Sequence, residues 1–338
     1  MTHIPEVSAG DATAPRLAAV VVNHNGGRHL PDCLRNLVAS RPRPDILVVD
    51  NASADGSVAT LEKDFPGIAL LRNERNRLFA PAANSGIDWA LARQATHVLV
   101  QNADVFWEPD ALGTLLDFLS ARPEAVACQP LLTRADRPGR IQSAGCRAAM
   151  TGRCRDALEG LPVAAAGTAP RPVLGASGAA LLLDARAIRR AGGFCEAFGM
   201  YFEDVELSLR LRALGGEIYC LPTARARHVG GASSAAYPAG RKAALCERNA
   251  LLLATRHYPA ACLAAALVLG PASAALAAAR HLATGAPGLA VGMLSGALAG
   301  LAAVPRHLAA RRILARNGAR PERFWPMVEA TTIFPGPR

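Results

Sequence analysis

The sequence predicts an α/β protein with a mostly parallel, doubly wound sheet flanked by helices, followed by a helical C-terminal region. Short Val-rich apolar runs alternate with segments of helical period over residues 16–130, which is typical of a parallel sheet. Hydrophobic residues make up 51% of the 338 positions and charged residues 19%, so the chain can bury a substantial core. From about residue 240 the sequence is Ala-rich and the alternation stops.

The elements are expected in a regular order. Four apolar runs of strand length end in polar residues, as buried parallel strands do; they are 16–25, 45–53, 68–73 and 97–104. Segments of helical period follow them at 30–40, 55–65, 80–95 and 109–121, and a further strand is expected at 125–130. Residues 137–172 are rich in Gly, Pro and Ala and predict a loop-rich insert. A strand and helix at 173–193, a helix from about 203, and two short strands at 217–222 and 224–230 come next.

Positive charge is concentrated at the C-terminus. The net charge is +10, and from residue 239 onward there are 12 Lys or Arg against 3 Asp or Glu. These basic residues flank apolar stretches instead of alternating with aromatics, which favours a membrane surface over nucleic acid as the partner. Residues 257–279 and 281–305 carry no Asp, Glu, Lys or Arg. They are long enough to span a bilayer, to lie in its interface as a helical pair, or to pack as soluble helices. We favour membrane association.

The remaining composition indicates a cytoplasmic protein. The eight cysteines show no C-x-x-C pair, so they are expected to be buried thiols in a reducing compartment. Residues 1–15 have neither a basic start nor an apolar run and are expected to form a short mobile tail, not a signal peptide.

Polar residues follow three of the predicted strands. Parallel strands meet at their carboxyl ends, where ligands bind, so these side chains should converge on one cleft, although Asn and Asp also favour turns. They are Asn23 and Asn25, Asp50 and Asn51, and Asn102 and Asp104.

The nucleotide motifs of oxidoreductases and P-loop enzymes are missing from the sequence, which has neither G-x-G-x-x-G after the first strand nor G-x-x-x-x-G-K-[ST]. Asp50 could instead accept the imide N–H of a uracil or thymine ring. Asn102 and Asp104 form a sparse oxygen-ligand pair of the kind that Mg²⁺ or Mn²⁺ uses beside phosphates. His228 could add a ligand, although a lone His is more often structural.

Three acids stand at the start of one predicted helix. Glu206 and Arg210 have the i, i+4 spacing of an ion pair on a helix surface. Glu203 and Asp204 lie in the first turn, after a Gly- and aromatic-rich loop that could line a pocket. One of them could be a general base, or both could stabilise the helix dipole; position alone does not decide.

Seven motifs resemble an inverting family 2 glycosyltransferase of the rhamnosyltransferase-like branch. In order they are VVVNHN, VVDNASADGS, NRLFAPAANSGI, LVQNADV, GASGAALLLDARAIRRAGGF, YFEDVELSLRLRALG and HVGGASS, spread over about residues 16–234. The resemblance implies a GT-A fold, a nucleotide-sugar donor and a divalent metal, Mg²⁺ or Mn²⁺. It further implies a catalytic domain at 16–238, with a nucleotide-binding half at 16–130 and an acceptor half at 131–238; composition and charge predict a basic helical region at 239–338.

The resemblance also implies roles for individual residues. Asp204 matches the catalytic base, with Glu203 holding the acceptor hydroxyls. Asp104, Asn102 and His228 match the metal-binding positions, through an N-P-D version of the D-x-D motif and the His before the Gly–Ser segment. The implied donor-binding residues are Asn23, Asn25, Asp50, Asn51, Asn84, Gly86, Asn102 and Gly178.

The sequence departs from the family pattern at four positions. Ala103 replaces the usual Pro of N-P-D, and Cys195 stands where an Asp is general, which puts one acceptor contact in question. Leu78 replaces a Gly and Pro81 a small residue in the loop expected to close over the donor. Donor identity is therefore the least determined property.

The expected function is transfer of rhamnose from dTDP-rhamnose, or of another sugar from a dTDP- or UDP-linked donor, to a glycan or lipid-linked saccharide at the inner face of the cell membrane. Two alternatives are an inactive, glycan-binding or scaffolding relative and a sugar nucleotidyltransferase. The first has no chemical reason to retain all four of Asp50, Asp104, Asp204 and His228. The second would need a triphosphate cradle after the first strand, which NHNGGRHLPD does not convincingly provide.

Overall fold

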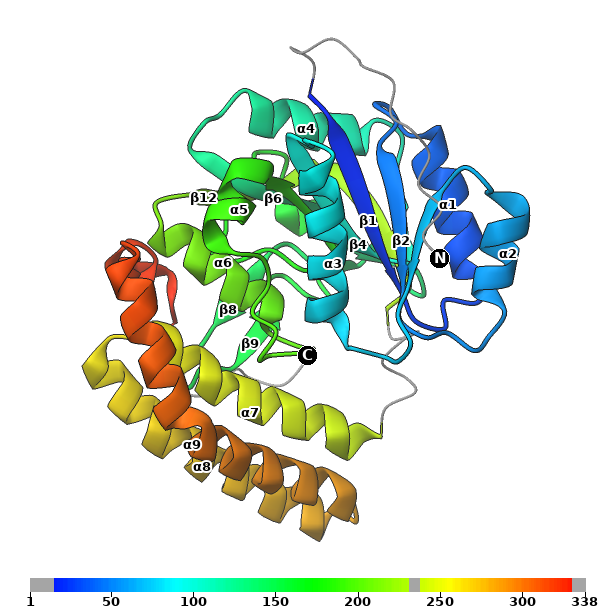
Figure 1. Ribbon diagram of the computed structural model, residues 1–338. Helices are drawn as coiled ribbons and strands as arrows, with labels where there is room; N and C mark the ends of the chain where they lie inside the picture. Colours follow the sequence, from blue (N-terminus) through cyan, green and yellow to red (C-terminus); the bar gives the residue numbers. More distant parts are fainter. Residues whose placement is uncertain (1–14, 231–237, 330–338) are drawn as a thin grey trace.

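The parallel half of the sheet forms as the sequence predicts. The computed structural model describes residues 15–230 and 238–329, so most of the predicted N-terminal tail and the GASS part of the last motif lie outside the described residues. Strands β1 (Leu17–Asn23), β2 (Asp45–Asp50), β3 (Ala69–Arg72) and β4 (His97–Asn102) pair in the order β3-β2-β1-β4, all parallel (Figure 1).

The other half of the sheet is mixed. Strand β11 (Ala180–Asp184) runs antiparallel between β4 and β6 (Ala125–Arg134), β12 (Glu217–His228) runs parallel to β6, and β10 (Arg171–Pro172) closes the edge. The short strands β5 (Val105–Trp107) and β7 (Ile141–Ser143) pair with β12 and β6. Apart from this sheet, β8 (Cys146–Ala148) and β9 (Cys154–Asp156) form a small hairpin.

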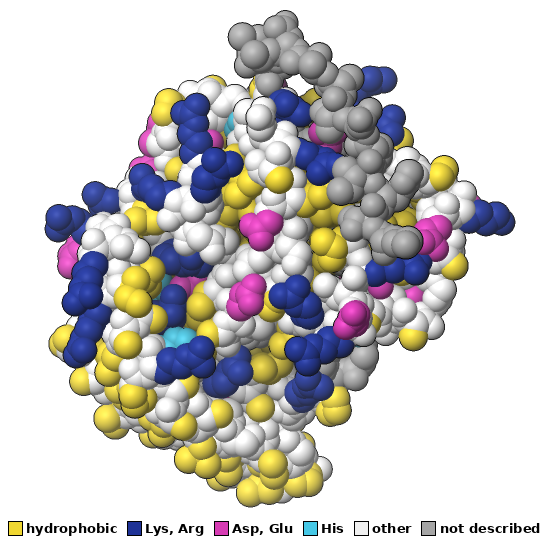
Figure 2. Space-filling model, viewed as in Figure 1, with side chains coloured by type: hydrophobic (Ala, Val, Ile, Leu, Met, Phe, Trp, Pro, Cys, Tyr) yellow, Lys and Arg dark blue, Asp and Glu magenta, His cyan; other side chains and the backbone are white. Residues whose placement is uncertain are grey.

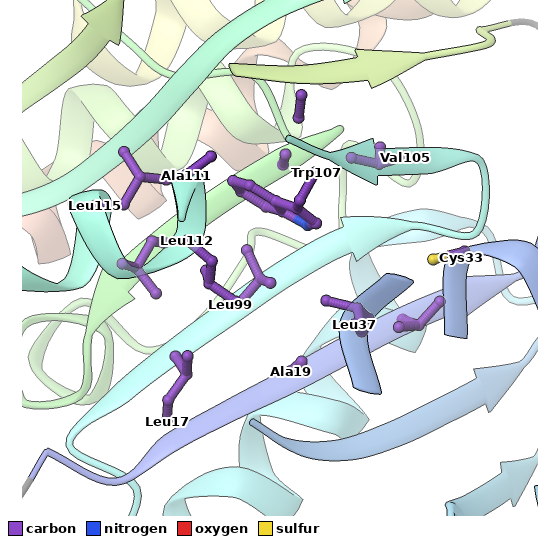
Figure 3. Packing of buried hydrophobic residues seen from close by; sticks show 14 of the residues in the cluster. Leu17, Ala19, Cys33, Leu37, Leu99, Val105, Trp107, Ala111, Leu112 and Leu115 are labelled. Atoms are coloured by element: carbon purple, nitrogen blue, oxygen red, sulfur yellow. The ribbon is translucent and has the colours of Figure 1, made fainter. Parts of the chain in front are cut away.

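Helices cover both faces of the sheet. On one face lie α1 (His29–Ala39), α2 (Ser57–Asp64) and α4 (Ala111–Ser120), and on the other α3 (Phe79–Ala92), α5 (Ala185–Ala191) and α6 (Glu203–Ala213). Strand β1 contributes side chains to the hydrophobic clusters on both faces of the sheet, because alternate side chains of a strand point to opposite faces. Ala19 joins the cluster with Leu99, Trp107 and Leu112 that Figure 3 shows, whereas Val20 packs with α3 on the opposite face.

Three sequence expectations need correction. The two strands expected at 217–222 and 224–230 are one strand, β12, with an irregularity between Leu221 and Arg225 where Pro222 cannot donate to the ladder. The run 97–104 splits into β4 and a turn before β5. The insert at 137–172 contains β7 to β10 and the 3₁₀ helix η1 (Val163–Ala166), so it has more regular structure than its composition suggests.

The C-terminal region is helical, as predicted. It contains α7 (Ala239–His257), α8 (Ala260–Ala283) and α9 (Pro287–Arg316), followed by the 3₁₀ turns η2 (Pro321–Arg323) and η3 (Trp325–Met327). Helices α8 and α9 have the length and apolar composition that a membrane span needs, with mean hydropathies of 2.0 and 1.7 and only 22% and 28% of the most apolar window buried. Figure 2 shows hydrophobic side chains gathered along the lower edge of the molecule, where Figure 1 places these two helices.

Helices α7 and α9 run parallel and touch through their backbones. A Cβ added at Gly292 would lie 2.1 Å from the carbonyl oxygen of Gly240, and one at Gly296 would lie 2.3 Å from that of Ala244. Further along, Arg311 of α9 donates to the carbonyl of Tyr258, just beyond the end of α7. Small residues therefore allow the backbones of α7 and α9 to touch, and Arg311 extends the contact to the end of α7.

Glu206 does not form the surface ion pair that the sequence suggests. The pair with Arg210 exists, at 2.7 Å, but Glu206 is completely buried. Its carboxylate also contacts Arg256 and His257 of α7, each at 3.1 Å. The i, i+4 spacing therefore predicts the ion pair correctly. It does not predict the burial of Glu206, which arises because α7, fifty residues away in sequence, covers this face of α6.

Gly292→Ala is expected to loosen the packing of α9 on α7, because its methyl group would meet backbone atoms. The expected loss in free energy of unfolding is about 1–3 kcal/mol, the usual range for overpacking, although Ala favours a helix over Gly by about 1 kcal/mol. Gly288→Ala is the matched control, since a Cβ there meets nothing within 4 Å. Equal stability of the two variants in chemical denaturation would contradict the close approach of these helices.

Candidate active site

A cavity of about 830 Å³ lies at the carboxyl ends of the parallel strands, where α/β sheets place their ligands. The ends of β1, β2 and β4 bound one side, the first turn of α6 and strand β9 bound another, and α7 and α9 complete the wall. Seven of the catalytic, metal-binding and donor-binding residues that the sequence predicts line this cavity: Asn51, Asn102, Asp104, Gly178, Glu203, Asp204 and His228.

Asp104, Asn102 and His228 come together as predicted, although β12 lies far from β4 in sequence. The Nε2 atom of His228 lies 3.1 Å from Oδ1 of Asp104 and 3.3 Å from Nδ2 of Asn102. The Gly230 amide donates to Oδ2 of Asp104 at 3.1 Å. Burial would raise the pKa of Asp104, but the hydrogen bond and charge of His228, together with the Gly230 amide, outweigh it and lower the pKa, so this carboxyl is ionised.

These three side chains fit a sparse site for a divalent metal. A carboxylate, an imidazole and an amide are ligands that Mn²⁺ accepts, whereas Mg²⁺ prefers oxygen alone. The Nδ1 atom of His228 is buried without a hydrogen-bond partner among the described residues, so Nε2 is the ring atom that the site engages. No group of three or more His, Cys, Asp or Glu residues with metal-binding placement occurs in the described part of the chain. A donor diphosphate would have to supply the remaining ligands.

Asp204 is held at the cavity by two backbone amides. Gly178 N donates to its Oδ2 and Val205 N to its Oδ1, each at 2.8 Å. A side chain at Gly178 would crowd Asp204, because a Cβ there would lie 3.3 Å from the aspartate Cβ. Burial raises the pKa of Asp204 and the amides only partly oppose this. The result is a fixed carboxylate that is more basic than an exposed Asp, which suits a general base.

Two further acids line the same side of the cavity. Glu203 is buried, its Oε2 has no hydrogen-bond partner among the described residues, and burial, with Asp204 adding, raises its pKa well above the usual range. Sequence reasoning missed Asp156, on β9. Burial raises the pKa of Asp156 to about 7; a hydrogen bond with Ser143 opposes the rise and Asp204 adds to it. In its protonated form, a carboxyl of this kind can donate a hydrogen bond to a ligand hydroxyl.

The loop before α6 is held in an uncommon conformation by α7. Tyr201 and Phe202 have φ values of 69° and 67°, in the left-handed region where non-Gly residues are strained. Asn249, completely buried in α7, donates to the carbonyl oxygens of Phe198, Met200 and Tyr201 at 3.1, 2.9 and 2.6 Å. Asn249 thus positions the loop that leads into Glu203 and Asp204. No local motif marks it in the sequence.

Asp50 and Asn23 lie behind the cavity wall. Asn23 Nδ2 donates to Asp50 Oδ1 at 2.9 Å, and Ser53 donates to both oxygens of the same carboxylate. Neither residue lines the cavity, whereas their neighbours His24 and Asn51 do. His24 went unnoticed in the sequence; its Nδ1 lies 3.0 Å from the carbonyl oxygen of Asn51. A contact between Asp50 and a nucleotide base stays a prediction.

Comparison with known proteins decides the family. The model of glycosyl transferase family 2 matches residues 18–158. The chain is 30% identical over 277 residues to the N-acetylglucosaminyl-diphospho-decaprenol L-rhamnosyltransferase of Mycobacterium tuberculosis, covering 71% of this chain and 85% of that relative. The chain belongs to glycosyltransferase family 2. The family resemblance seen in the sequence is confirmed. Membership of this family favours a glycosyltransferase over the inactive relative and the sugar nucleotidyltransferase that the sequence analysis left as alternatives.

Solved structures confirm the GT-A fold of this glycosyltransferase. GalNAc-T7, crystallised with UDP, GalNAc and Mn²⁺, matches with a TM-score of 0.57 and 14% identity over 74% of this chain, which spans about half, 49%, of that protein. A mannosyltransferase from Pyrobaculum calidifontis in complex with GDP-Man and Mn²⁺ matches with a TM-score of 0.53 and 20% identity, covering 88% of this chain and 90% of that one. At these identities the likeness concerns the fold alone.

The family departure at Leu78 has a structural counterpart. Leu78 lines the cavity with φ 68° and ψ −178°, a region of backbone space that is essentially reserved for Gly. Asn51 donates to its carbonyl at 2.9 Å and Asn76 accepts from its amide at 2.8 Å. The glycosyltransferase therefore keeps the Gly-type backbone at this position and adds a leucine side chain to the cavity wall.

Besides Asn23 and Asp50, three more predicted donor-binding residues do not line the cavity. Asn84 exchanges two hydrogen bonds with the backbone of Phe194, at 2.7 and 3.0 Å, and so ties α3 to the loop after α5. Gly86 allows α3 to approach β1, since a Cβ there would lie 2.1 Å from Val20. Asn25 is exposed and caps the loop at Ala54. These contacts give all three residues a structural role in the predicted nucleotide-binding half, residues 16–130. Their direct contact with a donor stays a prediction.

Asp204→Asn is expected to lower kcat by about 10²- to 10⁴-fold, the usual contribution of a general base, because an amide cannot take the acceptor proton. In the wild type, activity needs the ionised form, so it should fall as the pH drops through the raised pKa of Asp204, which lies above the ordinary value of 3.8. A pH profile of sugar transfer measures both effects. Asp156→Asn, the same change in the same cavity, should leave kcat within a few-fold; a larger loss there than at Asp204 would reassign the base.

Proposed function

We propose that this glycosyltransferase inverts the donor configuration and moves rhamnose from dTDP-rhamnose to a lipid-linked saccharide, with Asp204 as the general base. The observation that carries the proposal is that Asp204 and the Asp104–His228 pair line one cavity. The chemistry of donor and acceptor is supported by the Mycobacterium relative, whose name states an L-rhamnosyl transfer to N-acetylglucosaminyl-diphospho-decaprenol.

The proposed reaction is a single in-line displacement. An acceptor hydroxyl gives its proton to Asp204 as its oxygen forms a bond to the anomeric carbon of the donor. The bond between that carbon and the diphosphate oxygen breaks, and the electron pair leaves with the nucleoside diphosphate. Gly178 N–H and Val205 N–H orient the base during this step, and Glu203 holds a neighbouring acceptor hydroxyl through its unpartnered carboxyl oxygen.

Asp104, His228 and Asn102 would hold the divalent metal, Mg²⁺ or Mn²⁺. When bound, the ion stabilises the negative charge that develops on the leaving diphosphate. The low pKa of Asp104 keeps its carboxylate charged and ready to bind a cation at neutral pH.

We also propose that the protein binds the inner face of the cell membrane through α8 and α9. Large apolar side chains are exposed on both helices, among them Val268, Leu276, Val291 and Leu298 at 62–69% exposure. A contiguous apolar face of this kind is unusual on a soluble monomer. The same two helices carry the exposed side chains of Arg280, Arg306 and Arg312, which complement anionic lipid headgroups. All eight cysteines are free, which suits the reducing cytoplasmic side.

The packing of α9 favours helices that lie in the interface over helices that span the bilayer. Helix α9 contacts α7 from Gly288 to Arg311, and α7 buries Glu247, Asn249 and His257 against the catalytic domain. A spanning α9 would have to leave α7 or carry these polar groups into hydrocarbon. In the interface, α9 can keep its packing on α7 and direct its other face into the lipid.

The transferase proposal predicts metal-dependent rhamnose transfer. Purified protein with Mn²⁺ should transfer sugar from dTDP-rhamnose to a GlcNAc-diphospho-lipid, and EDTA should abolish the product. UDP-sugars and GDP-sugars complete the donor panel, with mass spectrometry of the acceptor as the measurement. Transfer from a UDP-sugar alone would correct the donor, whereas turnover of no donor with either Mg²⁺ or Mn²⁺ would overturn the proposal.

Membrane binding is expected to depend on the α8–α9 face. Wild-type protein should sediment with vesicles of anionic phospholipid and less with neutral vesicles. Leu276→Glu combined with Leu298→Glu should lower the bound fraction about tenfold or more, because both side chains are exposed and would bring charge into the lipid. The control is Leu161→Glu, since Leu161 is also exposed, at 45%, but lies in the insert. Unchanged binding of the double variant would exclude this face.

A further inference from the structure

The cavity extends from the general base to the apolar helices. Besides Asp204 it is lined by the Asp104–His228 pair, by Lys242 and Cys246 of α7 and by Met293 of α9. Met293 is half-buried, and its neighbours Val291 and Leu294 are exposed at 65% and 41%. The wall therefore contains carboxylates, a cation and a thioether, and the helix that carries the thioether also has exposed aliphatic side chains.

Lys242 lies close to the acids of this wall. Its ammonium lies 5.4 Å from the ring centre of Tyr201, in the loop that leads into Glu203 and Asp204. Cys246, one turn further along α7, is within electrostatic range of both Lys242 and Glu203. Lys242 is thus placed next to the acceptor side of the base, while the donor-side groups belong to β4 and β12.

The charge of Lys242 is available for a ligand. Among the described residues no carboxylate lies within 4.0 Å of its ammonium, whose recorded contact is the Tyr201 ring. Arg153, which lines the same region, is engaged differently: its guanidinium binds both carboxylate oxygens of Glu247 at 2.8 Å. The chain has only two lysines, Lys63 and Lys242, among 37 basic residues. An ammonium is the compact point charge with which proteins often bind phosphate.

We infer that Lys242 binds the diphosphate of a lipid-linked acceptor, in the part of the cavity between Asp204 and Met293. This inference rests on the proposed function and names the acceptor class: a sugar joined through a diphosphate to an aliphatic chain. The cavity wall offers a group for each part of such a molecule. The sugar hydroxyl lies at Glu203 and Asp204, the diphosphate at Lys242, and the lipid passes Met293 toward Val291 and Leu294.

A binding experiment tests the inference without catalysis. Full-length protein is titrated with farnesyl diphosphate and with farnesol, without divalent metal and in the presence of dTDP to occupy the donor site. Wild-type protein should bind the diphosphate at least tenfold more tightly than the alcohol, and Lys242→Ala should remove that difference. Lys242→Arg should restore part of it, and Lys63→Ala, at the exposed lysine of α2, should leave it unchanged. Equal affinity of the wild type for both compounds would overturn the inference.

A transfer experiment separates the acceptor from the donor. Lys242→Ala should raise KM about tenfold or more for a GlcNAc-diphospho-lipid, as loss of a charge-assisted hydrogen bond does. It should leave KM unchanged for an alkyl GlcNAc glycoside without phosphate, and the KM for the donor unchanged. Equal losses on both acceptors, or a loss on the donor, would contradict a diphosphate contact. If the wild type transfers no sugar, the proposed function fails, while the farnesyl diphosphate titration still decides the role of Lys242.

Discussion

The arrangement of the active site depends on one buried carboxylate. Glu206 is completely excluded from solvent, and burial alone would raise its pKa, yet Arg210, His257 and Arg256 hold that pKa well below its usual range. A buried charge is tolerated only when it is paired, so α6 cannot keep Glu206 in place unless α7 supplies the guanidinium of Arg256 and the imidazole of His257. Asp204 lies half a turn earlier on the same helix. The constraint that satisfies Glu206 therefore also fixes the helix that presents Asp204, the proposed base.

Helix α7 consequently belongs to the wall of the candidate active site, although it begins where the sequence places the boundary of the C-terminal region. Arg248 donates to the carbonyls of Ala197 and Phe198, and Asn249 binds three carbonyls of the same loop. These bonds offset the strain of the two left-handed residues, Tyr201 and Phe202, each of which costs of order 1–3 kcal/mol. The same helix carries α9 on its other side, so catalytic loop and apolar helices are joined through one rigid element.

The sequence predicts well whatever depends on local pattern. The parallel strands follow from short apolar runs, and Asn102 and Asp104 reach the cavity because they end one of them. The family motifs predict Asp204, Gly178 and His228 as site residues. These residues line one cavity although they are far apart in the sequence.

The features of the site that the sequence does not predict are those that depend on contacts between distant segments. The burial of Glu206 is set by Arg256 and His257, and nothing near Glu206 announces them. Asn84 and Gly86 stand in a family motif, but their contacts with Phe194 and Val20 are packing contacts. Lys242 and Asn249 lie in an Ala-rich helix with no chemical signature, and only the folded chain brings them to the active site.

The glycines between α7 and α9 have a geometric consequence. When two helices touch at their backbones, neither can rotate about its axis without collision, so the direction of each face is set relative to the other. The apolar face of α9 and the opening beside Asp204 therefore keep a constant angle. Residues with no side chain determine the orientation in which the catalytic domain stands above any surface that α9 rests on.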